Sequence, residues 1–189
     1  MNITVEEAII ELKNKKPVII FDIENENEGD LIYPSEILNK EILNFMLNNC
    51  KGVICTTLSK ERINELKIPI LKKKNNNLTG QTNFVYPIDH INSETGISSN
   101  DRLMIIKEII NKEVDLNNIV YPGHQNILKI SDGGLINRQG HTESSSELVK
   151  LAGYIESSTI CEILDENGTP LRYDNINVFS KKHNIKYIL

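Results

Sequence analysis

Short apolar runs alternate with segments of helical spacing along this chain, and this alternation limits the fold to a β-sheet flanked by helices. Residues 4–7 have the Thr-x-x-Glu pattern of a helix-capping box, and apolar residues at helical spacing follow it. The pattern predicts a helix over 5–15. Pro17 then introduces the apolar run 18–21, which predicts a buried strand over 18–22. The chain is therefore expected to begin with a helix and a strand.

The same alternation continues to the end of the chain. It predicts helices over 36–48, 99–111, 142–151 and 175–182, strands over 53–57, 83–88, 125–130, 158–164 and 185–189, and an exposed polar loop over 72–82. Helices and strands alternate too loosely for a strict βαβ repeat. Because no linker or break in composition interrupts the chain, we expect one α/β (α+β) domain over 1–189, with a mixed β-sheet flanked by helices.

Charge and composition exclude several classes of protein. The net charge is -5 and no basic stripe occurs, which argues against a nucleic-acid partner. No stretch approaches the roughly 20 apolar residues of a membrane-spanning helix. The N-terminal segment also lacks the pattern of a signal peptide, so we expect a cytoplasmic protein with no membrane partner. Three cysteines without a Cys-x-x-Cys spacing suggest neither a disulfide framework nor a thiolate zinc site.

Five acidic residues lie within nine positions, directly after the apolar run 18–21. They are Asp22, Glu24, Glu26, Glu28 and Asp30. A run of like charges is usually a solvated loop, but this run leaves the end of a strand and contains Gly29, which permits a tight turn. We expect an acidic loop that is well placed to hold a cation or a polyhydroxylated substrate.

A second candidate site surrounds His141, at the start of the helix expected over 142–151. A helix N-terminus presents unpaired amides and a partial positive charge that attract phosphate. Gly140 lets the backbone approach closely, Arg138 can bind two phosphate oxygens, and Thr142 can add a hydroxyl. The alternative interpretation is that Thr142 is an ordinary helix cap and Arg138 a surface charge.

His141 and a carboxylate of the acidic run together also suggest a metal site. Oxygen-rich ligands suit Mg²⁺ or Mn²⁺, which keep several waters and complete their shell with substrate oxygens. A zinc hydrolase is disfavoured because no His-Glu-x-x-His pattern occurs. The residue types alone do not show which carboxylate of the acidic run binds the metal ion. Among the other histidines, His124, directly after Pro122–Gly123, is the second candidate for a functional role.

Several segments resemble the 3,4-dihydroxy-2-butanone 4-phosphate synthase family of riboflavin biosynthesis, in the order and approximate spacing of that family. They are Glu26–Asp30, Thr95–Ser98 with Asp101–Arg102, Pro122–His124 and Arg138 with Gly140–Glu143, and the likeness continues at Leu151–Gly153, Cys161–Glu162 and Lys181–His183. The resemblance covers nearly the whole chain. It implies a homodimer of α/β subunits with active sites at the subunit interface. It also implies conversion of ribulose 5-phosphate to 3,4-dihydroxy-2-butanone 4-phosphate and formate, with Mg²⁺ required.

The resemblance further implies a role for each matching residue. Glu26 and His141 would bind the metal ion, while Asp30, His124 and Glu162 would form the catalytic, proton-handling set. Cys55 matches a cysteine near the site, with an open role. The implied substrate-binding residues are Asn25, Glu26, Asp30, Thr95, Arg138, Gln139, Gly140, His141, Thr142 and Glu162.

Asn25 is the main departure from the family, which usually has arginine directly before the metal-binding glutamate. Asparagine can hydrogen-bond but supplies no charge. The family also usually has arginine where Tyr121 stands and alanine where Ser144 stands. An inactive or altered sugar-phosphate-binding relative is therefore one alternative. A nucleotide or RNA binder of the threonylcarbamoyl-adenylate synthase type is another, although its basic binding surface is not evident in the sequence. No GTP cyclohydrolase segment follows, so we expect the monofunctional form.

Overall fold

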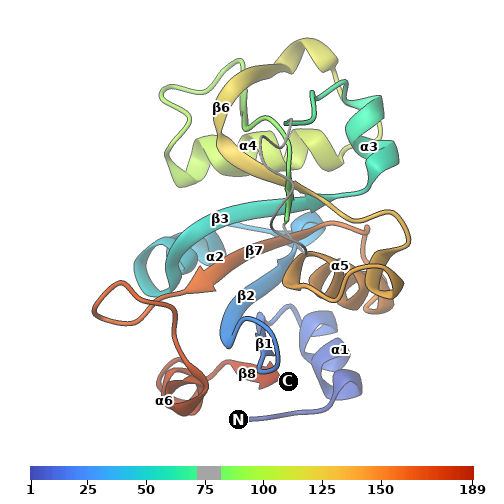
Figure 1. The fold of residues 1–189 in the computed structure, drawn as a ribbon. Helices are drawn as coiled ribbons and strands as arrows, with labels where there is room; N and C mark the ends of the chain where they lie inside the picture. Colours follow the sequence, from blue (N-terminus) through green and yellow to red (C-terminus); the bar gives the residue numbers. More distant parts are fainter. Residues whose placement is uncertain (72–81) are drawn as a thin grey trace.

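The computed structural model describes residues 1–71 and 82–189, and a mixed β-sheet forms its centre (Figure 1). Its strands are β1 (Val18–Asp22), β2 (Glu28–Pro34), β3 (Lys51–Leu58), β4 (Asn83–Phe84), β5 (Ile88–His90), β6 (Ile119–Lys129), β7 (Ser158–Ile163) and β8 (Lys186–Ile188). The order is β4-β6-β3-β7-β2-β1-β8, and β5 pairs with β6. The pairs β1–β8 and β3–β6 are parallel and the others are antiparallel. The expected mixed sheet is confirmed.

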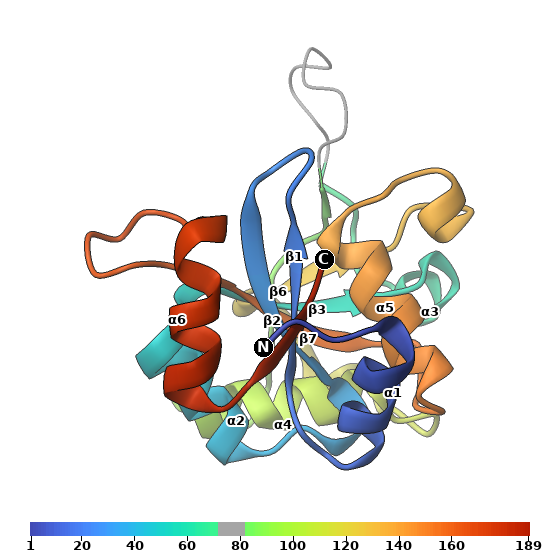
Figure 2. The same cartoon turned by 90° about the horizontal axis from the view of Figure 1, so that it is seen from below.

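Helices cover both faces of this sheet. They are α1 (Val5–Lys13), α2 (Lys40–Phe45), α3 (Lys60–Glu65), α4 (Ser99–Ile110), α5 (His141–Leu151) and α6 (Tyr173–His183). Figures 1 and 2 show α1 and α5 on one side of the central strands, with α2 and α6 on the other. No helix in the described part of the chain is long and apolar enough to cross a membrane.

Alternating side chains of β1 separate two layers of the core. Val18 and Ile20 pack in a cluster with residues of α1 and α5, whereas Ile19 and Phe21 pack with residues of α2, α4 and α6. This division follows from the period of two along a strand, which sends successive side chains to opposite faces. A third cluster joins β6 to α3 and α4. The two faces of β1 are thus buried by different helices, and Asp30, which pairs with Ile20, lies on the face towards α5.

Local sequence signals account for most of the helix starts. Thr4 and Glu7 form the expected reciprocal capping box before α1. Ser98 caps α4 by accepting a hydrogen bond from the backbone N–H of Asp101. The single helix expected over 36–48 is instead divided into a 3₁₀ turn, α2 and a π-helical turn that ends at Cys50. Helix α3 was not predicted, although Ser59 caps it.

The acidic run is not the continuous loop that the sequence predicted. Strand β2 begins at Glu28, and β1 and β2 form a hairpin in which Phe21 pairs with Gly29. Gly29 therefore does not form the tight turn; Asn27, with a φ of 51°, adopts the left-handed conformation there. A Cβ on Gly29 would lie 2.8 Å from the ring of Phe21, so glycine is needed for close packing. Apart from Thr82, the loop expected over 72–82 lies outside the described residues.

Candidate functional site

Strand register brings two distant carboxyl groups together on the α5 face of the sheet. Asp30 in β2 is the direct antiparallel partner of Glu162 in β7. Directly opposed side chains in an antiparallel pair lie on one face and can interact. The Glu162 carboxylate accepts a hydrogen bond of 2.8 Å from the backbone N–H of Val53. A Cβ on Gly52 would lie 2.8 Å from that carboxylate, so the glycine leaves the space in which Glu162 is held.

Helix α5 places His141 against this pair. The helix packs on the sheet through Leu148 and Val149, and the Ser146 hydroxyl lies 2.7 Å from the Thr57 hydroxyl in β3. Its first residue, His141, directs Nδ1 towards the β1–β2 hairpin. Nδ1 lies 3.2 Å from the Glu26 carboxylate and 3.7 Å from that of Asp30. The expected proximity of His141 to the acidic run is therefore found in the fold.

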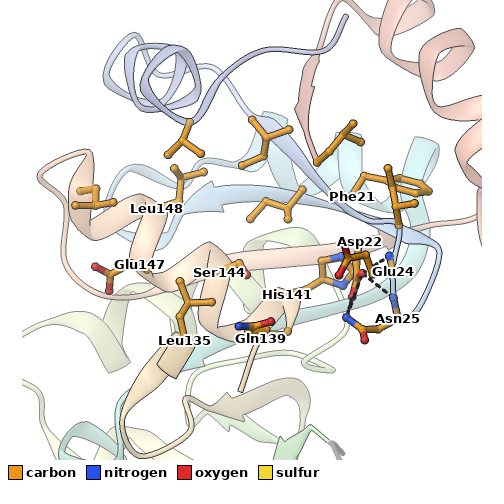
Figure 3. Close-up of a pocket in the computed structure, with 17 residues that line it drawn as sticks. Phe21, Asp22, Glu24, Asn25, Leu135, Gln139, His141, Ser144, Glu147 and Leu148 are labelled. Carbon is orange, nitrogen blue, oxygen red and sulfur yellow. Dashed lines mark hydrogen bonds between the residues drawn. The ribbon is translucent and has the colours of Figure 1, made fainter. Parts of the chain in front are cut away.

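The converging side chains line a cavity of about 350 Å³. Its lining includes Glu26, Glu28, Asp30, Cys55, Arg138, His141, Thr142 and Glu162. Two further hollows of about 590 and 530 Å³ adjoin it around Asn25, Gln139 and Gly140. Figure 3 shows the larger one, with His141 close to Asp22 and Asn25 at one end. Every implied substrate-binding residue except Thr95 lines one of these three spaces.

Burial and mutual charge shift the ionisation of the central groups. Burial raises the pKa of Asp30 from 3.8 to about 7, with the positive charge of His141 opposing this effect. Burial would lower the pKa of His141, but the carboxylates of Asp30 and Glu26 outweigh it and raise the pKa from 6.5 to about 9. The hydrogen bond from His141 lowers the pKa of Glu26, against an opposing effect of burial. The site therefore holds a protonated histidine between two carboxyl groups of different acidity.

The Glu26–His141 pair fits a divalent cation of the magnesium type. An octahedral ion with ligands at about 2.1 Å needs neighbouring ligand atoms roughly 3 Å apart, and the Glu26 oxygen and His141 Nδ1 lie 3.2 Å apart. The other ring nitrogen, Nε2, is buried and has no hydrogen-bond partner among the described residues. No group of three or more His, Cys, Asp or Glu side chains in 1–71 and 82–189 is arranged to hold a metal. Two protein ligands would leave the remaining positions to water and substrate.

The N-terminus of α5 and Arg138 form the expected polar border of the cavity. Gly140 occupies the N-cap position without a side-chain cap, so the first-turn amides have no capping side chain. Arg138 forms an ion pair with Glu143 and donates a 3.1 Å hydrogen bond to Thr82. An added Cβ on Gly140 would clash with the Arg138 guanidinium, so glycine lets this cation pack across the helix end. Arg138 is thus held beside the helix N-terminus by Glu143, a contact that the sequence did not predict.

Glu28 lines the cavity although it is not among the site residues that the resemblance implied. Burial raises the pKa of Glu28, and Arg172 lies 3.7 Å from its carboxylate. The missed signal is its position in β2, where a period of two places Glu28 on the same face as Asp30. Cys55 also lines the cavity, and burial raises the pKa of its thiol, which keeps it protonated at neutral pH.

Thr95 and His124 line none of the three spaces around Glu26 and His141. They belong to a second cluster, where β5, β6 and the start of α4 meet. Asp89 binds the ring of His124 at 2.7 Å, and Gly96, next to Thr95, packs against both side chains. The structure therefore does not bring all of the implied site residues together within one chain.

A sequence model described as 3,4-dihydroxy-2-butanone 4-phosphate synthase matches residues 6–189. A synthase of that name from Photobacterium phosphoreum is 40% identical over 97% of this chain and 51% of its own length. A two-domain synthase structure from A. baumannii is 34% identical with a TM-score of 0.92, covering 98% of this chain and 55% of that one. A synthase structure with two magnesium ions is 29% identical with a TM-score of 0.89, covering 98% and 92%. The chain spans about half the length of the first curated relatives.

Proposed function

Because this chain belongs to the 3,4-dihydroxy-2-butanone 4-phosphate synthase family, we propose that it converts D-ribulose 5-phosphate to L-3,4-dihydroxy-2-butanone 4-phosphate and formate in riboflavin biosynthesis. The observation that carries the proposal is the convergence of Glu26, Asp30, His141 and Glu162 in one cavity beside the N-terminus of α5. The proposed reaction requires groups that stabilise an enediolate, move protons and hold a phosphate, and this cavity brings candidates for all three side by side. A cytoplasmic location stays a prediction from the sequence.

Glu26 and His141 are the proposed ligands of Mg²⁺ or Mn²⁺. Such an ion would stabilise the negative charge that develops on the carbonyl and neighbouring hydroxyl oxygens when the sugar loses a proton next to its carbonyl. One of the related structures is a complex with two magnesium ions, which supports this choice of metal. The 3.2 Å separation of the two ligand atoms supports the choice of residues.

The substrate phosphate is proposed to bind at the start of α5. The amides of its first turn attract an anion, and Thr142 contributes a hydroxyl at the edge of the cavity. Arg138 lies beside these groups and can bind phosphate oxygens, with Gln139 and Gly140 in the adjoining hollow. The sugar would then extend towards Asp30 and Glu162. These two carboxyl groups are positioned to take and return protons during enediolate formation, dehydration, rearrangement of the carbon skeleton and loss of carbon 4.

We also propose that the protein is a homodimer in which Thr95 and His124 of one subunit complete the cavity of the other. Their separation from Glu26 and His141 within one chain supports this arrangement. Val120 and Tyr121 in the same strand as His124 are exposed, and the ring of Tyr121 lies 6.2 Å from that of Tyr86, which is also exposed. Exposed apolar residues that gather in one patch commonly mark an interaction surface. A second subunit would cover this patch and bring His124 to the substrate.

Formate release from ribulose 5-phosphate is the direct test. We expect formate to form with Mg²⁺ and to disappear when EDTA removes the metal. Glu26→Gln should abolish formate release and weaken Mn²⁺ binding, because an amide is a poorer ligand than a carboxylate. Glu41→Gln is the matched control: the residue lies exposed in α2 and lines none of the three spaces of the site. Normal turnover by Glu26→Gln would contradict the metal assignment, and absence of formate from the wild-type protein would contradict the function.

Asn25 favours a second candidate function, that of an altered sugar-phosphate-binding relative. Its side-chain amide lies 3.2 and 3.4 Å from the two oxygens of Asp22, so it is tied into the hairpin turn. Because an asparagine amide is uncharged, Asn25 cannot supply the positive charge of the family's usual arginine. This candidate predicts that ribulose 5-phosphate binds while formate release is negligible.

A further inference from the structure

Both carboxylate oxygens of Asp89 contact His124. One Asp89 oxygen accepts a 2.9 Å hydrogen bond from the backbone N–H of His124. The other oxygen lies 2.7 Å from Nδ1 of the same residue. An ionised carboxylate can only accept hydrogen bonds, so Nδ1 must carry a proton. In the neutral ring, Nε2 is then the unprotonated nitrogen.

The backbone is shaped to make this contact. The pairing of β5 with β6 is interrupted between Ile88, which pairs with Gln125, and Asp89, which pairs with Val120. Residues 121–124 of β6 are therefore extra residues opposite that interruption. Such a bulge redirects side chains. Here the bulge places the ring of His124 next to the carboxylate of Asp89.

Two glycines allow the close packing around Asp89. A Cβ on Gly96 would clash with the Asp89 carboxylate and the His124 ring, and a Cβ on Gly123 would clash with the backbone of Ile88 and Asp89. The Asp89 side chain is 13% exposed, whereas that of His124 is 49% exposed. The carboxylate is therefore enclosed, while the ring it holds remains open to a substrate or a second subunit.

We propose that Asp89 is a positioning residue that keeps His124 in the tautomer with the proton on Nδ1 and presents Nε2 as the base. Nε2 takes a proton from the substrate, the resulting imidazolium keeps its Nδ1–H bond to Asp89, and Nε2 returns the proton in a later step. This inference rests on the proposed function, in which His124 of one subunit reaches the substrate bound at the other. It adds a residue that does not line the cavity around Glu26 and His141 and that acts through the ring of His124.

Asp89→Asn provides a nearly isosteric test. The amide oxygen must stay with the backbone N–H of His124, because only that atom of the amide can accept. The NH₂ group then faces Nδ1 and forces the proton onto Nε2. Nitrogen NMR of the histidine rings, with His124 assigned from the spectrum of His124→Asn, should show a proton on Nδ1 in the wild type and on Nε2 in Asp89→Asn.

Kinetics should separate this role from a general effect on folding. We expect kcat of Asp89→Asn to fall roughly 10²- to 10⁴-fold, the usual contribution of a general base. Asp174→Asn is the control, because it makes the same atomic change at an exposed position in α6. Asp89→Asn should match this control in its KM for ribulose 5-phosphate, its Mn²⁺ affinity and its thermal midpoint. The double variant Asp89→Asn/His124→Asn should be no less active than His124→Asn alone, because both changes act through one ring.

Each result decides the inference. A wild-type His124 with its proton on Nε2 would overturn it without any variant, even if Asp89→Asn did not fold. An unchanged tautomer of His124 or an unchanged kcat in Asp89→Asn would overturn the inference. In that case, formate release by the wild type would still support the proposed function. Absence of formate from the wild type would reject the proposed function, and with it the catalytic part of the inference. The NMR measurement would still show whether Asp89 determines the tautomer of His124.

Discussion

Asp30 and Glu162 are direct partners in the register of β2 and β7, so two carboxyl groups from distant parts of the chain lie on one face of the sheet. Asp30 is buried there, 3.7 Å from Nδ1 of His141. This arrangement joins proton-handling groups to the proposed metal site. Because burial disfavours the ionised form of Asp30, this arrangement also lowers the stability of the folded state when Asp30 is charged.

Replacing Asp30 with asparagine should lower activity while making stability less dependent on pH. The pKa of Asp30 rises from 3.8 in the unfolded chain to about 7 in the fold. The folded state therefore binds this proton more tightly, and ionisation of Asp30 destabilises the fold increasingly as pH rises towards about 7. For Asp30→Asn we expect kcat to fall roughly 10²- to 10⁴-fold. The thermal midpoint of the metal-free variant should gain more at about pH 8 than at about pH 5.

Asp174→Asn, which changes the same atoms on exposed α6, is the control for both measurements. If Asp30→Asn raised the thermal midpoint equally at both pH values, burial would not raise the pKa of Asp30. Full activity of Asp30→Asn would remove Asp30 from the proton-handling set.

Metal binding should release a proton and strengthen with pH. His141 has its pKa raised to about 9, so near neutral pH its ring is protonated in the metal-free protein. A metal can bind Nδ1 only after that proton leaves. The apparent Mn²⁺ affinity should therefore rise about tenfold per pH unit below about pH 9. Calorimetry in two buffers with different heats of ionisation should detect about one proton released per ion at neutral pH. Binding without proton release would exclude His141 as a ligand.

Mixing two inactive variants should restore activity if each site takes residues from both subunits. In a heterodimer of Glu26→Gln and His124→Asn chains, one site carries both changes and the other carries neither. Random exchange makes half of the dimers mixed, so about a quarter of wild-type activity should return. Formate release after subunit exchange measures this, and each variant alone is the control. No recovery, in a mixture that light scattering shows to be dimeric, would place each site within a single subunit.

Replacing Asn25 with arginine should raise activity. Asn25 lines two of the hollows around the site, and its amide now bonds to Asp22. A guanidinium there would add a positive charge facing an anionic substrate, so we expect kcat/KM to rise roughly tenfold, by about 1.4 kcal/mol of charge-assisted hydrogen bonding. The gain should shrink at high salt. Asn25→Gln, which adds length without charge, should show no gain; an equal gain by Asn25→Gln would exclude charge as the cause.

Elements with strong local signals were predicted well. The capping box at Thr4 and the apolar period after it predicted α1, and the apolar run after Pro17 predicted β1. Helix α5 was expected over 142–151 and begins one residue earlier, at His141. In each case neighbouring residues in the sequence supply the deciding interaction, so periodicity and capping were sufficient.

Strand β2 was missed because its sequence does not look like a strand at its start. Glu28, Gly29 and Asp30 have low strand propensity, and pairing with β1 and β7 overrides it. The same error assigned Gly29 to a turn and left Glu28 outside the site. Pairing with distant strands is not visible in a local pattern, so propensity alone could not find it.

The amino-acid sequence was sufficient to identify the chemical groups of the chain, the starts of α1, α4 and α5 to within one residue, and the family. Which of those groups meet depends on the tertiary structure. It placed Asp30 beside Glu162 and His141, and it left His124 in a separate cluster with Asp89. The physical reason is that strand register and burial depend on contacts between distant segments, and it is these contacts that shift a pKa or fix a tautomer.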